Sequence, residues 1–147
     1  MSALVGCSCQ HVLIPDWDEL IQRDDYKRAP GATDDQLDAA EQALALMFPA
    51  ELRSLYLVSD GVVDAAGQWF VIWPLDMLIA ENLRRRSDQM LPHEAIAFGD
   101  NGAGDPFVVF EGQRAVSCWY PIEGRTTQLA AGLDVFWRGW TDGTIAT

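Results

Sequence analysis

The chain has 147 residues, 49% of them hydrophobic, and carries 22 acidic against 10 basic side chains, a formal net charge of −12 at pH 7. Its length suits one ordinary domain, and six Trp and six Phe supply apolar surface for a core. The charge argues against direct binding of nucleic-acid phosphates or anionic lipids and would attract a basic partner, although it would also serve solubility alone. We therefore expect a single domain over residues 1–147 that binds neither nucleic acid nor membrane.

The N-terminal stretch 1–11 lacks the basic region and apolar run of a signal peptide, and no segment has the roughly 20 apolar residues that span a bilayer. A cytoplasmic location is the expectation, with residues 1–14 a flexible N-terminal segment.

Metal-ligating side chains gather at one place in the sequence, Cys7, Cys9 and His11. The Cys-x-Cys spacing differs from the Cys-x2–4-Cys pairs of zinc sites, and the later candidates are only His93 and Cys118. Three cysteines do not imply a closed disulfide framework, and Cys118 fits a buried strand. We expect no metal and no cofactor.

Helical signals fill the first half of the chain. An acidic first turn within 15–21 predicts a helix that ends before the breaker at 29–31. Thr33 and Gln36 then form a capping-box pattern ahead of a second helix with Leu37, Ala40 and Leu44 on one face.

A third helix is expected to open at Pro49 and to close at Gly61 in a left-handed cap. Glu41 lies on the apolar face of the second helix, where a carboxylate could act as an acid or base. No titratable partner is spaced to complete a catalytic pair, so we expect instead a buried ion pair or hydrogen bond to Arg53 or Tyr56.

Strand signals and two further helices fill the second half. Aromatic and β-branched runs predict strands, and repeats at i, i+3, i+4 and i+7 predict helices. The strands are expected at 68–73, 96–98, 107–110, 116–120 and 127–129, and the helices from about 74 to 86 and over 133–140.

The glycine-rich loop Gly99–Gly104 joins two of these strands, which we expect to form the central pair of a sheet. Its glycines match neither a P-loop nor Gly-x-Gly-x-x-Gly, and no helix follows to meet a phosphate. Asp100, Asn101 and Asp105 lack the ligand spacing of a calcium loop. A structural turn is the first interpretation, and an acidic surface feature for a partner is the second.

The order of these motifs resembles the SUKH superfamily, the Smi/Knr-like domain. The resemblance covers roughly 31–140 and rests on short motifs from the opening helices, the middle strands and the aromatic closing helix. These motifs are Gly31-Ala-Thr33, Leu37, Glu41, Leu44, Phe48-Pro49-Ala-Glu51-Leu52-Arg-Ser-Leu55-Tyr56, Asp60-Gly61, Trp73-Pro74-Leu75 and Ile96-Ala-Phe98-Gly99-Asp100-Asn101-Gly102-Ala-Gly104-Asp105.

The resemblance implies an α/β (α+β) fold, a curved and mostly antiparallel sheet flanked by N-terminal helices and a C-terminal helix. It also implies a non-enzymatic role, with no catalytic residues to transfer. Bacterial members are typically immunity proteins of toxin–antitoxin type that neutralise polymorphic toxins, often nucleases, and fungal relatives regulate cell-wall assembly. The fungal proteins usually carry disordered extensions, and this sequence shows none, which favours a bacterial immunity protein. The alternative is an intracellular regulatory or scaffold module.

A toxin with a basic nuclease domain would suit the acidic surface, with aromatic anchors inside a charged rim. The candidate partner-binding residues are Trp73, Asp100, Asn101, Asp105, Trp119 and Tyr120. For each, the alternative is structural: the tryptophans lie in the core and the loop is only a turn. A small enzyme or ligand-binding domain that uses Glu41 or His93 stays open as a third class.

Overall fold

The computed structural model describes residues 14–22, 26–64 and 66–147. Within these residues the strands form two antiparallel sheets, in the orders β1–β2–β3 and β4–β5–β6–β7. The expected α+β class is confirmed. The helices are α1 (Trp17–Ile21), α2 (Asp34–Leu44), α3 (Ala50–Val58), α4 (Leu75–Ser87) and α5 (Leu133–Asp142). The strands are β1 (Tyr26–Arg28), β2 (Val62–Asp64), β3 (Phe70–Ile72), β4 (Ala95–Asp100), β5 (Pro106–Phe110), β6 (Val116–Tyr120) and β7 (Arg125–Ala130).

The first helix is shorter than the sequence predicts. Asp16 caps α1 by accepting a hydrogen bond from the Glu19 N–H at 3.3 Å, but the helix ends at Ile21. Tyr26–Arg28 is a strand that pairs antiparallel with β2, and the Tyr26 ring meets Trp137 of α5 edge-on at 5.2 Å. The prediction of a helix reaching the 29–31 breaker was therefore wrong, because strand pairing and aromatic packing override weak local propensity.

The capping box of the second helix is confirmed. The Thr33 hydroxyl accepts from the Gln36 N–H at 3.1 Å, and the Gln36 side-chain oxygen accepts from the Thr33 N–H at 2.9 Å. Leu37, Ala40 and Leu44 are buried, as their spacing predicts. The prediction that Gly61 caps the third helix was wrong. The helix α3 ends at Val58 and Ser59 is extended, although Gly61 does adopt a positive φ of 95°.

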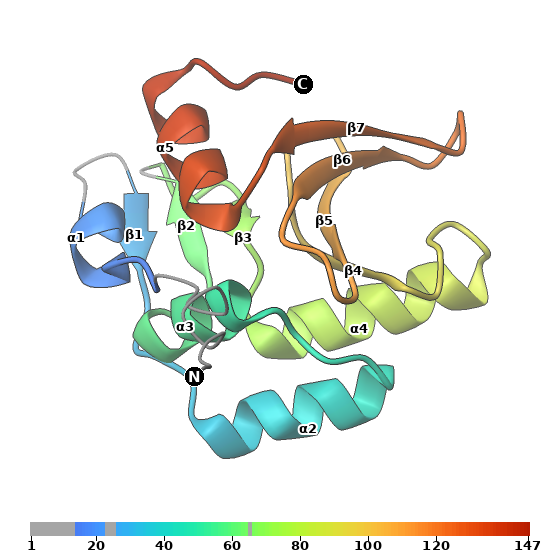
Figure 1. Ribbon diagram of the computed structural model, residues 1–147, viewed down its shortest axis with the longest axis horizontal. Helices are drawn as coiled ribbons and strands as arrows, with labels where there is room; N and C mark the ends of the chain where they lie inside the picture. Colours follow the sequence, from blue (N-terminus) through green and yellow to red (C-terminus); the bar gives the residue numbers. More distant parts are fainter. Residues whose placement is uncertain (1–13, 23–25, 65) are drawn as a thin grey trace, which may run out of the picture.

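The four-stranded sheet curves strongly, with α5 against one side and α4 along β4, while α2 packs on α4 (Figure 1). β4 is an edge strand of this sheet rather than part of its centre. The end of β3 runs beside it, where the Trp73 N–H donates to the Phe98 carbonyl at 2.8 Å. The two sheets therefore meet along β3 and β4.

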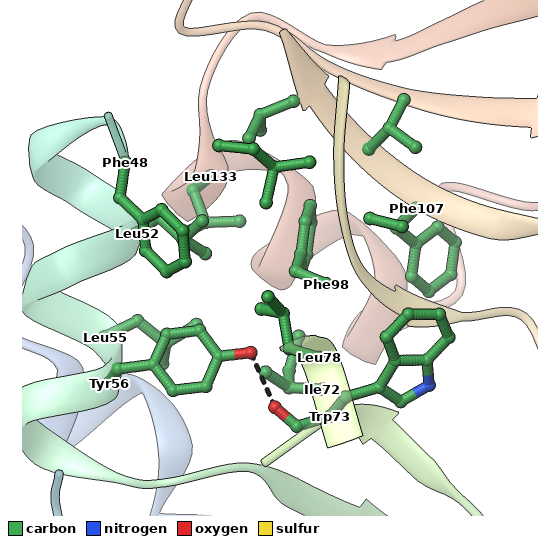
Figure 2. Close-up of a cluster of buried hydrophobic side chains, with 14 of the residues drawn as sticks. Phe48, Leu52, Leu55, Tyr56, Ile72, Trp73, Leu78, Phe98, Phe107 and Leu133 are labelled. Carbon is green, nitrogen blue, oxygen red and sulfur yellow. Dashed lines mark hydrogen bonds between the residues drawn. The ribbon is translucent and has the colours of Figure 1, made fainter. Parts of the chain in front are cut away.

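One apolar core joins the helices to this junction. Figure 2 shows Leu52, Leu55 and Tyr56 of α3 facing side chains of the strands, and the Tyr56 hydroxyl donates to the Trp73 carbonyl at 2.5 Å. The ring of Phe136 on α5 packs 4.7 Å from that of Phe107. Among the described residues, no helix is long and apolar enough to cross a membrane.

Candidate functional site

Trp73, the first candidate anchor, is a core residue. Its side chain is 1% exposed, and its carbonyl holds the Tyr56 hydroxyl. The Arg85 guanidinium lies 5.7 Å from the centre of the indole ring. This position agrees with the alternative that Trp73 is a core residue, and its side chain is too buried to contact a partner.

The acidic loop between β4 and β5 folds on its own side chains. The Asp100 carboxylate accepts from the Gly102 N–H at 2.8 Å, and the Asn101 carbonyl oxygen accepts from the N–H groups of Ala103 at 2.8 Å and Asp105 at 3.3 Å. The Asn101 amide also donates to the Asp105 carboxylate at 3.4 Å. These bonds mark a structural turn.

The same loop rests on an aromatic ring. Trp69 donates its indole N–H to the Asp100 carbonyl at 3.3 Å. Gly102, with φ of 84°, lies over this ring, and a Cβ there would come within 3.5 Å of it. Trp69 was absent from the candidate residues, because nothing in the sequence shows that β3 comes beside this loop.

Trp119 and Tyr120 point to opposite faces of β6, as successive strand residues do. Trp119 donates its indole N–H to the Met90 carbonyl at 2.7 Å and lines a small hollow with His93. Tyr120 lies under the Arg125 guanidinium, 4.4 Å from the ring centre. Burial, the hydrogen bond to Cys118 and nearby charges that include Asp105 raise the pKa of Tyr120. The candidates therefore divide among the core, the loop and two faces of the sheet.

The Glu41 carboxylate is held from two sides. One oxygen lies 3.1 Å from the Arg53 guanidinium, and the other accepts from the Phe48 N–H at 2.8 Å. The expected ion pair with Arg53 is confirmed, whereas the Tyr56 hydroxyl bonds elsewhere. Glu41 therefore closes the turn after α2.

The connection from α2 to α3 exposes a methionine. Ala45 ends α2 in a left-handed conformation, with φ of 55°. In the extended chain that follows, Leu46 and Phe48 point into the core at 8% and 5% exposure, which turns Met47 outward at 66% exposure. The Glu111 carboxylate, from the β5–β6 turn, accepts from the Met47 N–H at 3.0 Å and holds it in place.

An open hollow of about 450 Å³ lies beside this methionine. It is formed where the α2–α3 connection passes the β5–β6 turn (Figure 1). We call it the Met47 hollow; it is lined among others by Asp38, Glu41, Gln42, Leu46, Met47 and Glu111. Sequence reasoning missed it, because Glu111 reaches Met47 only through the tertiary fold.

The Met47 hollow is electronegative. Arg53 is shared among Asp34, Asp38 and Glu41 at 3.1, 3.2 and 3.1 Å. Burial alone would lower the pKa of Arg53, but the Asp34 hydrogen bond and the charges of Glu41 and Asp38 outweigh it and raise that pKa. Among the described residues Glu111 forms no ion pair, and α2 has no basic residue in its own last turn. The cation at the end of this helix is Arg86 of α4, which donates to the Leu44 carbonyl at 2.7 Å.

A second hollow of about 270 Å³ adjoins on the other side of Met47 and includes Arg114. Arg114 donates through Nε to the buried Glu51 carboxylate at 3.2 Å, and this bond raises the pKa of Arg114. Its guanidinium also borders the start of α5, 3.3 Å from where a Cβ on Gly132 would lie. Arg114 therefore serves the fold.

The remaining candidates for chemistry are the Cys118 thiol and groups of metal-ligating side chains. Cys118 on β6 is fully buried, and this burial raises the pKa of its thiol. Within the described ranges no three His, Cys, Asp or Glu side chains could hold a metal ion. Cys7, Cys9 and His11, and most of the expected flexible segment 1–14, lie outside the described residues.

The SMI1/KNR4 family (SUKH-1) model matches residues 31–139, which span α2 to α5. The chain therefore belongs to the SMI1/KNR4 (SUKH-1) family, as its motifs predict. No curated protein matches the sequence significantly.

Proposed function

We propose that this protein is a cytoplasmic immunity protein that binds and neutralises a cognate protein toxin, whose toxic part is a basic nuclease domain. The observation that carries the proposal is the excess of 22 acidic over 10 basic residues on a SUKH-1 domain. Among the described carboxylates only Glu51 is buried, so the remaining negative charge lies at or near the surface. Such a surface accelerates encounter with a basic protein and repels nucleic acid.

The proposal includes action by binding rather than by catalysis. Glu41, the candidate acid or base, already holds Arg53 and the Phe48 N–H, and burial raises the pKa of the Cys118 thiol, which disfavours its thiolate. His93 is exposed beside Trp119, in a hollow of about 290 Å³. Engaged or protonated groups are poor nucleophiles and bases, which supports a binding role.

A regulatory or scaffold module is the second candidate, because the resemblance to the SMI1/KNR4 family also includes the fungal regulators of cell-wall assembly. Its partner would be a protein of the same cell that is present without any toxin. Affinity capture from toxin-free cells separates the two functions, since an immunity protein would retain no stoichiometric partner there.

A growth-protection assay tests the immunity function. The reading frame adjacent to this one at its locus is expressed under tight control, alone and together with this protein. We expect growth arrest in the first case and restored growth in the second. A toxic neighbour that still arrests growth in the presence of this protein would contradict immunity to that toxin.

A further inference from the structure

We infer that the Met47 hollow is where the protein receives a Lys or Arg side chain of its toxin, an inference that rests on the proposed function. The first support is its shape. Met47 is exposed at the border of two hollows, and its backbone is fixed by the Glu111 carboxylate and by its buried neighbours Leu46 and Phe48. An apolar side chain held outward in this way is a preorganised contact.

The second support is charge complementarity. Asp38, Glu41 and Glu111 line the hollow, and no Lys or Arg is among the described residues that line it. Arg53, which pairs with two of these carboxylates, is divided among three. An acidic ligand would be repelled. Since these carboxylates do not form a group that could hold a metal ion, the geometry favours a long cationic side chain. Its aliphatic stem would cover Met47 while its charged end reaches Glu111, as amphipathic Lys and Arg side chains do.

Gln42 allows a clean test. It is exposed on α2, lines the hollow, and its side chain has no hydrogen-bond partner among the described residues. A cation at this position would occupy the hollow from within and pair with Asp38 one helical turn away. Gln128 on β7 is also an exposed glutamine and does not line the hollow, so Gln128→Arg makes the same change in net charge elsewhere.

The experiment measures association and dissociation of the toxin encoded by the adjacent reading frame with wild type, Gln42→Arg and Gln128→Arg, each with its melting temperature. We expect Gln42→Arg to weaken binding about tenfold or more with the melting temperature unchanged, and Gln128→Arg to stay within about twofold. If the toxin binds the wild type and binds the two variants with equal affinity, the hollow is not the binding site, but the immunity function still stands.

A second measurement does not depend on the toxin. Isotope-labelled full-length protein is titrated with hexa-arginine and followed by NMR. The expected shifts concentrate on the amides of Gln42, Met47 and Glu111 and are lost in Gln42→Arg. Shifts spread evenly over the acidic surface would overturn the inference. Focused shifts without toxin binding would keep the hollow and reject the adjacent toxin as its partner.

Discussion

The side-chain amide of Asn82 on α4 pairs with both backbone groups of Ala97 on β4. It donates to the Ala97 carbonyl at 2.7 Å and accepts from the Ala97 N–H at 2.9 Å, and a second donor bond reaches Leu78 at 2.8 Å. β4 is an edge strand of its sheet, and its other side pairs with β5. The buried Asn82 amide therefore occupies the place of a neighbouring strand and protects the edge.

Replacing Asn82 with leucine should lower the free energy of unfolding by about 2–4 kcal/mol, because two buried backbone groups of Ala97 lose their partners. Urea denaturation measures the loss. The exposed change Gln128→Leu serves as control and should stay within about 0.5 kcal/mol. A loss below about 1 kcal/mol for Asn82→Leu would show that water or another group replaces the amide.

Gly99→Ala should destabilise the junction of the two sheets. A Cβ at this position would lie 1.9 Å from the Val71 carbonyl oxygen on β3, so one strand must move. We expect a loss of about 3 kcal/mol or more in thermal or urea unfolding. Gly104→Ala, in open space with φ of 96°, should cost only the left-handed strain of about 1–2 kcal/mol. If Gly99→Ala and Gly104→Ala lost the same stability, β3 would be able to move away from the added Cβ at no energetic cost.

Cys118 should resist thiol reagents in the folded protein. Burial raises its pKa, so less thiolate is present at a given pH, and the reagent cannot reach it without local opening. In a Cys7→Ser, Cys9→Ser background, reaction with an aromatic disulfide at pH 8 should be at least about 100-fold slower than in urea, as an opening cost of about 3 kcal/mol implies. Similar rates in both conditions would contradict the buried position.

Glu81 should stabilise the fold only above acidic pH. Its hydrogen bond from Arg84 at 2.9 Å, with the charges of Arg84 and Arg85, lowers its pKa below the usual 4.5 despite partial burial. A lowered folded-state pKa adds stability above the unfolded pKa, and that stability is lost as the pH falls through the folded value. Glu81→Gln should therefore cost about 0.5 kcal/mol at pH 7 and nothing near pH 3. A cost that persists unchanged at pH 3 would exclude the ion pairs as its origin.

Local signals in the sequence determined much of the secondary structure. The capping box at Thr33 is confirmed, β6 has the bounds that its residues predict, and α4 and α5 begin within one residue of expectation. The reason is physical: caps and side-chain periodicity act between residues a few positions apart. The same short motifs were sufficient to indicate the family.

The tertiary structure decided what depends on distant residues. Tyr26 became strand because β2 offered backbone partners, and Trp73 lies in the core because the end of β3 packs beside β4 and within the apolar cluster. The sequence does indicate that Asn82 is unusual, because it is a polar residue on the apolar face of α4 with Leu75 and Leu78. Nothing in the sequence indicates that its partner is Ala97. The Met47 hollow exists only because the β5–β6 turn brings Glu111 to the end of α2. Long-range pairing of this kind leaves no pattern in a single sequence, since its energy comes from contacts that form only when the chain has folded.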